Sequence, residues 1–137
     1  MITLSKCDYE MILNHCLGQL PNEACGLLAG RVAGNKKTVE KIYLLSNIDQ
    51  SPKHFSMEPQ EQFGAIKDMR AKDLILLGNF HSHPGSPARP SEEDIRLAFE
   101  PDKSYLILSL AEENPILKSF MIINRQVTNE ELIIKGE

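Results

Sequence analysis

The chain has 137 residues, of which 42% are hydrophobic and 25% are charged, and its formal net charge is −4. This composition is that of an ordinary folded protein and excludes intrinsic disorder, while the length predicts one domain, residues 1–137, with a single core. The acidic balance and the absence of tryptophan argue against nucleic-acid binding, because phosphate contacts need basic surfaces and single strands need aromatic platforms.

The first residues do not form a targeting segment, because Asp8 and Glu10 interrupt the region where a signal peptide would be apolar. No apolar run approaches the roughly 18 residues needed to span a bilayer, so we expect no membrane partner. Cys7, Cys16 and Cys25 are spaced nine residues apart, unlike a zinc knuckle or a redox motif. An odd number of cysteines without a signal predicts reduced, core-packed thiols in a cytoplasmic protein.

Hydrophobic periodicity and turn residues predict helices that alternate with strands along the chain. Helices are expected over residues 5–20, 60–71 and 91–99. Strands are expected over 24–32, 38–45, 73–80, 104–110, 117–124 and 127–134, with a hairpin turn at 34–35 and an irregular loop over 46–59. Gly26 marks a close backbone approach within a buried strand. This order predicts an α/β class with a single-domain mixed β-sheet flanked by helices.

The most informative segment is residues 78–94, GNFHSHPGSPARPSEED. His81 and His83 lie two residues apart at a strand end, and alternate strand residues share a face, so both imidazoles can reach one point. Asp94 follows in the first turn of the next predicted helix, after a proline-rich loop of restricted backbone. Two histidines and one carboxylate form a three-ligand zinc set that leaves the fourth position to water.

Each part of this segment also has a purely structural explanation. A single His-x-His pair is weak evidence for a metal, and Ser91 followed by Asp94 fits a helix capping box. Capping does not account for the paired histidines before a proline-rich loop. The two explanations are also compatible, because a residue in the first turn of a helix can project a carboxylate toward a metal.

The pattern His81-x-His83, seven residues, Ser91, two residues, Asp94 resembles the JAMM (MPN+) metallopeptidase motif without a gap. Upstream, residues 23–28 (EACGLL) are similar to the segment in which that family carries its catalytic glutamate. The intervening loop is similar to the family's Asn…Pro…Phe-x-Met-x-Pro stretch, with its positions here at Asn47, Pro52, Phe55, Met57 and Pro59. The resemblance implies the deaminase-like JAMM/MPN fold.

The resemblance also implies a role for each site residue. His81, His83 and Asp94 would bind one zinc ion per chain. Glu23 would move the proton of the attacking water, and Ser91 would support the oxyanion. The residues alone do not select Glu23 from the other acids, and it could equally be a surface acid at a strand start. Its apolar neighbours favour partial desolvation and a raised pKa.

The chain is similar to the small stand-alone prokaryotic members of this family, which process ubiquitin-like sulfur carriers. The resemblance implies hydrolysis of the amide or isopeptide bond after the carrier's C-terminal Gly-Gly. Loops 46–59 and 84–90 are the expected walls of the tail channel, with Phe55 and Met57 favoured as core residues over tail contacts. His54 is expected to be solvated or packed and not a metal ligand, with a contact to the substrate tail as the less favoured alternative. A homodimer is left open.

Two alternative functions remain open from the sequence. A general deconjugating isopeptidase would free ubiquitin-like modifiers from protein lysines. A non-catalytic MPN scaffold would only bind partners. The scaffold is disfavoured because such relatives have lost metal ligands, whereas His81, His83, Asp94, Ser91 and Glu23 are all present here.

Overall fold

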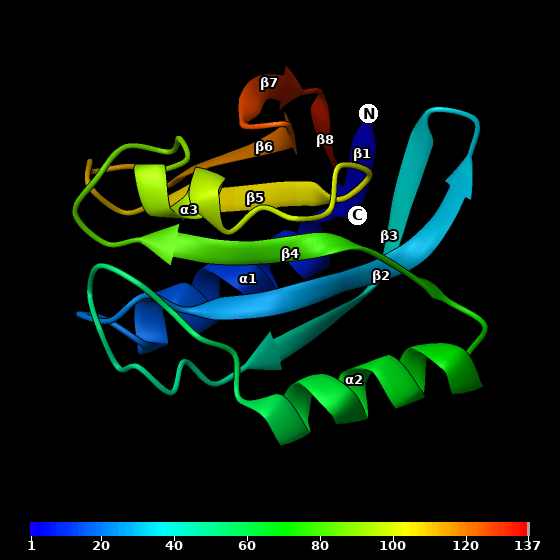
Figure 1. Ribbon diagram of the computed structural model, residues 1–137, viewed down its shortest axis with the longest axis horizontal. Helices are drawn as coiled ribbons and strands as arrows, with labels where there is room; N and C mark the ends of the chain where they lie inside the picture. Colours follow the sequence, from blue (N-terminus) through cyan, green and yellow to red (C-terminus); the bar gives the residue numbers. More distant parts are fainter. Residues whose placement is uncertain (137) are drawn as a thin grey trace.

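The computed structural model describes residues 1–136, and one eight-stranded sheet runs through them in the order β7-β6-β5-β4-β2-β3-β1-β8 (Figure 1). The strands are β1 (Ile2–Ser5), β2 (Cys25–Ala33), β3 (Lys36–Leu45), β4 (Ile75–His83), β5 (Ser104–Ser109), β6 (Ile116–Ile123), β7 (Gln126–Glu130) and β8 (Leu132–Lys135). The helices are α1 (Lys6–Gly18), α2 (Pro59–Ala71) and α3 (Glu92–Arg96). Parallel pairs β1/β3, β1/β8 and β4/β5 stand beside antiparallel ones, so the predicted mixed sheet flanked by helices is confirmed.

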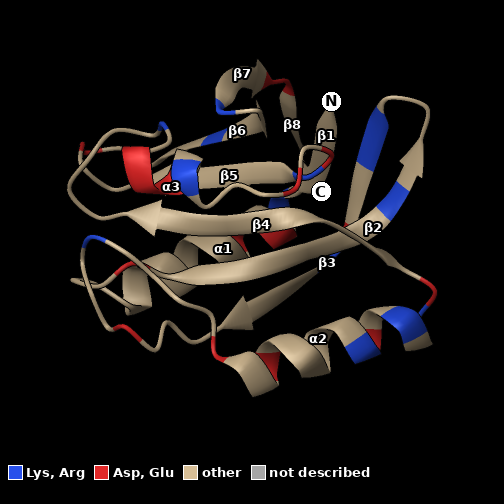
Figure 2. Cartoon of the chain, in the orientation of Figure 1, with Lys and Arg blue, Asp and Glu red and all other residues tan. Residues whose placement is uncertain are grey.

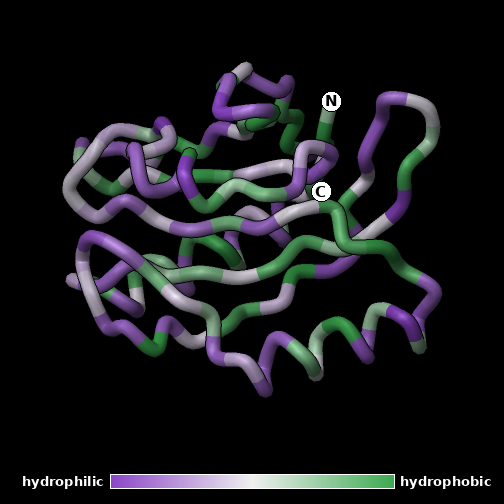
Figure 3. Tube along the Cα trace, viewed as in Figure 1, coloured by the Kyte–Doolittle hydropathy of each residue, from purple (hydrophilic) through white to green (hydrophobic). Residues whose placement is uncertain are grey.

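The centre of the sheet is covered on both faces. Leu28 of β2 packs in one apolar cluster with Ile12 of α1, while its neighbour Leu27 packs in a second cluster with Met69 of α2. Successive residues of β2 therefore enter opposite cores, as the two-residue period of a strand requires. Figure 3 shows hydrophobic stretches along the central strands and hydrophilic loops at their ends. The functional loops thus extend from a rigid, doubly buried support.

Gly26 fixes how closely the two central strands pack. A β-carbon at this position would collide with the ring of Phe80 on β4 and with the backbone carbonyl of Tyr43 on β3. The close approach expected at Gly26 is therefore confirmed. It maintains the antiparallel register in which Cys25 of β2 faces His81 of β4, and this register brings the start of β2 to the end of β4.

The expectation of one strand over residues 127–134 is wrong. Two short strands, β7 and β8, occupy this segment and lie at opposite ends of the sheet order, separated in sequence by Glu131 alone. Because one residue joins the two edges, the sheet must curl until they meet, as Figure 1 shows. Strand β1, which periodicity over so few residues does not reveal, inserts between β3 and β8.

A polar cluster lies at the seam of the curled sheet. The Glu130 side chain is 5% exposed and accepts hydrogen bonds from the hydroxyls of Ser104 (2.6 Å) and Ser119 (2.7 Å). The Lys37 ammonium lies 3.3 Å from the same carboxylate. Although burial raises the pKa of Glu130, the hydroxyls and the ammonium lower it below its usual value. The buried charge is therefore paired and hydrogen-bonded.

Two local expectations are also corrected. Helix α3 ends at Arg96 instead of reaching residue 99, because the side chain of Phe99 is 79% exposed and packs too little to favour another turn. Cys7 is exposed, whereas Cys16 and Cys25 are buried as expected, and all three are free thiols. Within residues 1–136, no helix is both long and apolar enough to cross a membrane.

Candidate active site

The two histidines of the motif lie at the buried end of β4. His81 and His83 are each 3% exposed and point to the same side of the strand. Ser82 between them points to the opposite side, where its hydroxyl accepts a 2.8 Å hydrogen bond from the backbone N–H of Ala24. The end of β4 is thereby anchored to the start of β2. The predicted convergence of the two imidazoles is present in the fold.

Asp94 completes a compact three-ligand cluster. The Nε2 atoms of His81 and His83 lie 3.1 Å apart, and each lies 3.1 Å from Oδ2 of Asp94. Tetrahedral zinc with bonds of about 2.0–2.1 Å to nitrogen places its ligand atoms about 3.3 Å apart. The three atoms therefore match one face of such a tetrahedron, and the donor set of two imidazoles and one carboxylate fits zinc.

Asp94 is held by its own helix. Ser91 is the N-cap of α3, with its hydroxyl accepting from the N–H of Asp94 (3.0 Å) and its own N–H donating to Oδ2 of Asp94 (2.9 Å). The predicted capping box is thus confirmed, and the same carboxylate oxygen faces both histidines. Capping orients Asp94 toward the cluster, so the structural and the ligand explanations apply to one residue.

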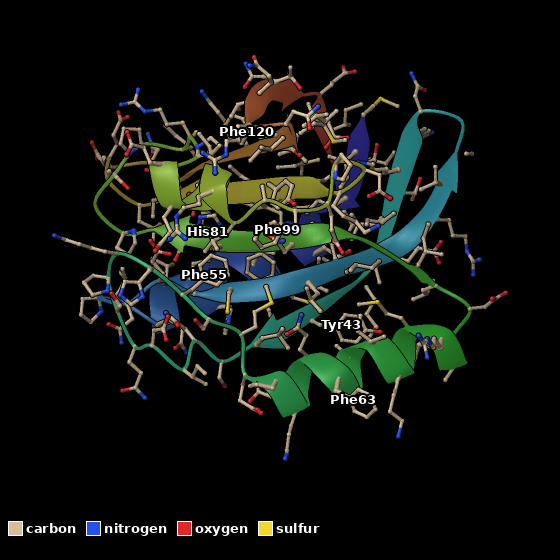
Figure 4. All side chains as sticks on the ribbon, in the orientation of Figure 1. Tyr43, Phe55, Phe63, His81, Phe99 and Phe120 are labelled. Atoms are coloured by element: carbon tan, nitrogen blue, oxygen red, sulfur yellow. The ribbon has the colours of Figure 1, made fainter. Side chains whose placement is uncertain are left out.

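The two imidazoles are oriented by different contacts. Nδ1 of His83 lies 2.9 Å from the carbonyl of Pro87, which can only accept, so Nδ1 carries the proton and Nε2 presents its lone pair to the cluster. Nδ1 of His81 is buried and has no hydrogen-bond partner among residues 1–136. Its ring is instead stacked on Phe55, as seen in Figure 4, with the ring centroids 4.7 Å apart.

The charges of the cluster favour a cation. Burial raises the pKa of Asp94, but hydrogen bonds from His81 and His83 outweigh it and hold the pKa well below its usual range. Burial lowers the pKa of His83, yet its bonds to Asp94 and to the carbonyl of Pro87 leave the net pKa raised. A buried, ionised carboxylate beside two imidazoles attracts positive charge, either a proton or a metal ion.

Glu23 is a buried acid, and the alternative of a surface acid is wrong. Glu23 is 5% exposed, and it lines one depression together with His83 and Ser91. Burial raises the pKa of Glu23 to about 8, although the charge of His83 acts in the opposite direction. The structure therefore gathers all five predicted site residues around the end of β4, from three separate segments of the chain.

Sequence reasoning did not assign a role to Asn47, which organises the loop beside the site. Its Nδ2 donates to the carbonyls of Glu23 (3.0 Å) and His54 (3.1 Å), and its Oδ1 accepts from the N–H groups of Asp49 (3.0 Å) and Ser56 (3.1 Å). All four hydrogen-bonding positions of the amide are used. Three of these partners lie within nine residues of Asn47, and only the bond to Glu23 spans a longer separation of 24 residues, which no local pattern reveals.

The cluster stands between two depressions. The narrower one, about 280 Å³, includes His81 and Asp94 in its wall, and the wider one, about 760 Å³, includes His83. The narrower depression is lined also by Phe55, Met57, Asn79, Leu97 and Tyr105 among others. Phe55 and Met57, expected mainly in the core, both pack against the α2 cluster and line this depression. A chain crossing the cluster could occupy both.

The chain is similar to several known proteins. The family model of prokaryotic homologs of the JAB domain matches residues 8–123. The chain is 32% identical over 117 residues to the CysO-cysteine peptidase of Mycobacterium tuberculosis, covering 85% of this chain and 79% of that protein. It is 38% identical over 85 residues to the probable TtuB-protein conjugate cleaving protease of Thermus thermophilus, covering 61% and 54%. A protein from Desulfitobacterium hafniense has a solution structure with a TM-score of 0.92 at 58% identity, covering 100% of this chain and 94% of that one.

Proposed function

The chain belongs to the family of prokaryotic homologs of the JAB domain, and from this we propose that it is a zinc-dependent hydrolase acting on ubiquitin-like sulfur-carrier conjugates. The bond cleaved is the amide or isopeptide bond after the carrier's C-terminal Gly-Gly. The observation that carries the proposal is the buried cluster of His81, His83 and Asp94, whose ligand atoms lie 3.1 Å apart. Relatives named as a peptidase and as a conjugate-cleaving protease support the same reaction class.

His81, His83 and Asp94 would hold one zinc ion per chain, each through a single atom. Bound there, zinc supplies a Lewis acid and lowers the pKa of a coordinated water to about 7. The hydrogen bond from His83 to Pro87 and the capping box around Asp94 fix the donor atoms before any metal enters. Three protein ligands would leave the fourth position of a tetrahedral zinc ion to water or substrate.

Glu23 is the general base and acid of the proposed reaction. It shares a depression with His83 and Ser91, so its carboxylate can accept the proton of the attacking water and return it to the leaving amine. Burial raises the pKa of Glu23 toward the neutral range, where a carboxyl group exchanges protons most effectively. A nearby divalent cation would shift that pKa down again by favouring the charged form.

Ser91 supplies a hydrogen bond to the developing oxyanion. Its hydroxyl oxygen accepts from the N–H of Asp94, and this leaves the hydroxyl proton free to donate. The side chain lines the same depression as Glu23. A donor preset at this position stabilises negative charge that forms only in the transition state, and this is the condition for a catalytic effect.

The partner is a ubiquitin-fold carrier protein with an extended Gly-Gly tail. The smaller depression beside His81, about 280 Å³, would hold the end of this tail, and Phe55 and Met57 form part of its wall. We further propose that residues 1–137 act as one JAMM/MPN domain in the cytoplasm, on the support of the single sheet from β1 to β8 and the three free thiols.

A second candidate is a general isopeptidase that removes ubiquitin-like modifiers from protein lysines. It is favoured by the similarity to the probable TtuB-protein conjugate cleaving protease, whose name describes a conjugate with protein. The two candidates share the metal cluster and the carrier tail, and they differ in the group that leaves. The scaffold alternative would need neither metal nor proton transfer.

The test combines metal content with turnover. The purified protein, reconstituted with zinc, is expected to bind about one zinc per chain and to cleave a ubiquitin-fold carrier whose Gly-Gly end is extended by cysteine. The Glu23→Gln variant should retain zinc and lose about 10²–10⁴-fold in rate. The His83→Ala variant should lose both zinc binding and activity. Protein that binds no zinc on reconstitution would overturn the proposal and favour the scaffold. Zinc-loaded protein that cleaves only a lysine-linked carrier would favour the second candidate.

A further inference from the structure

The wider depression beside the cluster is the place for the leaving group. Glu23, which in the proposed function returns a proton to the leaving amine, lines this depression of about 760 Å³ and not the narrower one. The narrower depression of about 280 Å³ fits the glycine tail on the acyl side of the bond. The residue released by hydrolysis must therefore lie in the wider depression, next to Glu23.

The wall of the wider depression includes one basic residue, Lys53. The site residues Glu23, His83 and Ser91 also line this depression. The other lining residues are apolar or small: Leu20, Pro21, Pro52, Pro84, Gly85 and Ser86. Lys53 is the one Lys or Arg of the loop 46–58, where Figure 2 shows a single basic stretch. No carboxylate among residues 1–136 pairs with the Lys53 ammonium. Lys53 is exposed, so its ammonium is free to pair with an anion that enters the depression.

The backbone holds Lys53 close to Glu23. The N–H of Glu23 donates to the carbonyl of Ser51 (2.8 Å), and the carbonyl of Glu23 accepts from Asn47 (3.0 Å). Two residues beyond this anchor, the N–H of Lys53 donates to the hydroxyl of Ser51 (3.1 Å). The loop that carries Lys53 is thus clamped to the residue that would protonate the leaving amine.

From this placement we infer that Lys53 binds the α-carboxylate of a leaving amino acid, and so is the residue that selects carrier tails ending in one. The inference rests on the proposed function and assigns its leaving group. In an amino acid the carboxylate is one carbon from the amine, so a cation beside Glu23 can reach it. A lysine side chain released from a protein offers four methylene groups there and no carboxylate.

The reaction balances as a simple hydrolysis. The C–N bond between the last glycine and the amino acid breaks, and the water oxygen bonds to the glycyl carbon to give a carboxylate. The amine leaves with the protons passed on by Glu23, as an amino acid whose carboxylate is paired with Lys53. No oxidant, reductant or further reactant is needed.

The test compares two probes that differ in one group. A ubiquitin-fold carrier ending in Gly-Gly-Cys is offered with either a free α-carboxylate or an α-carboxamide, and kcat/KM is measured with the zinc-loaded enzyme. The native enzyme is expected to prefer the free acid by about tenfold, the size of effect typical for one hydrogen bond to a charged group. Lys53→Met should reduce this preference to near one, and Lys53→Arg should restore it. Lys36→Met, which removes an exposed lysine of β3, should keep it.

A binding measurement separates recognition from turnover. In the Glu23→Gln background, calorimetric affinity for the free-acid probe should fall about tenfold when Lys53→Met is added. The inference would be overturned if the native enzyme had equal kcat/KM for the free-acid and the carboxamide probe. It would also be overturned if Lys53→Met lowered kcat/KM equally for both probes. Either outcome would leave the proposed function standing. Zinc-loaded protein that cleaves no carrier adduct, lysine-linked or amino-acid-linked, would overturn the proposed function itself.

Discussion

The ring of Phe55 stacks on the imidazole of His81, with centroids 4.7 Å apart and planes inclined by 27°. Figure 4 shows the pair where the end of β4 meets the loop that precedes α2. The other ring nitrogen of His81, Nδ1, has no hydrogen-bond partner among residues 1–136. Stacking thus takes the orienting role that the hydrogen bond to the Pro87 carbonyl performs for His83.

Replacing Phe55 should therefore weaken metal binding without removing a ligand. Aromatic pairs contribute about 0.5–1.5 kcal/mol beyond their buried area, so Phe55→Leu should weaken zinc affinity by about 2–10-fold. Phe55→Tyr retains the stacked ring and serves as the matched control. Competition with a chromophoric zinc chelator measures the zinc affinity of each variant. Equal zinc affinities for Phe55→Leu and Phe55→Tyr would show that the stack does not orient His81.

Removing the Asn47 amide should loosen the loop and the backbone of Glu23 together. Asn47→Ala leaves two carbonyls and two N–H groups without their partner, and a single unsatisfied buried group costs about 1–3 kcal/mol. Urea unfolding should show a loss of at least that size, accompanied by lower activity. Asn14→Ala, at an exposed position of α1, is the control and should change stability little. An Asn47→Ala variant as stable as the control would contradict the assigned role.

Two substitutions at Ser91 separate helix capping from catalysis. Ser91→Ala loses the cap, at a cost of about 1 kcal/mol, whereas Ser91→Gly costs only a few tenths of that. Both remove the hydroxyl that would donate to the oxyanion, so both should retain zinc and lose about 10²–10³-fold in turnover. Measuring thermal stability, zinc content and turnover rate for each variant distinguishes the capping role from the catalytic role. Activity that follows stability, with Ser91→Gly near normal, would leave Ser91 as a cap only.

The metal-free protein should become less stable as the pH rises through the neutral range. Burial raises the pKa of Glu23 from 4.5 to about 8, so between these values the folded state holds a proton that the unfolded state releases. Stability then decreases with rising pH in this window. Thermal unfolding at several pH values should show a steeper decrease for the native protein than for Glu23→Gln. Glu92→Gln, at an exposed acid, should behave like the native protein, and identical slopes for all three would rule out a buried, protonated Glu23.

The cluster of His81, His83 and Asp94 could be predicted from the sequence because its geometry is local. His81 and His83 share a face of one strand, and Asp94 occupies the first turn of the next helix, where capping residues announce its position. Neither feature depends on the rest of the fold. The element order likewise followed from hydrophobic periodicity, apart from short strands such as β1 and the division between β7 and β8.

The remainder of the site depends on pairings between distant segments. Glu23 comes near His83 only because β2 pairs with β4 in a register that Gly26 permits, and no local pattern distinguishes it from other acids. The four hydrogen bonds of Asn47, the stacking of Phe55 and the position of Lys53 likewise depend on how one loop folds against β2 and β4. The sequence by itself therefore determined the family, the cluster of two histidines and one aspartate, and the class of fold. Tertiary structure decided which acid is buried, what orients each imidazole and which charge faces the leaving group, because these properties arise from desolvation and from long-range backbone contacts.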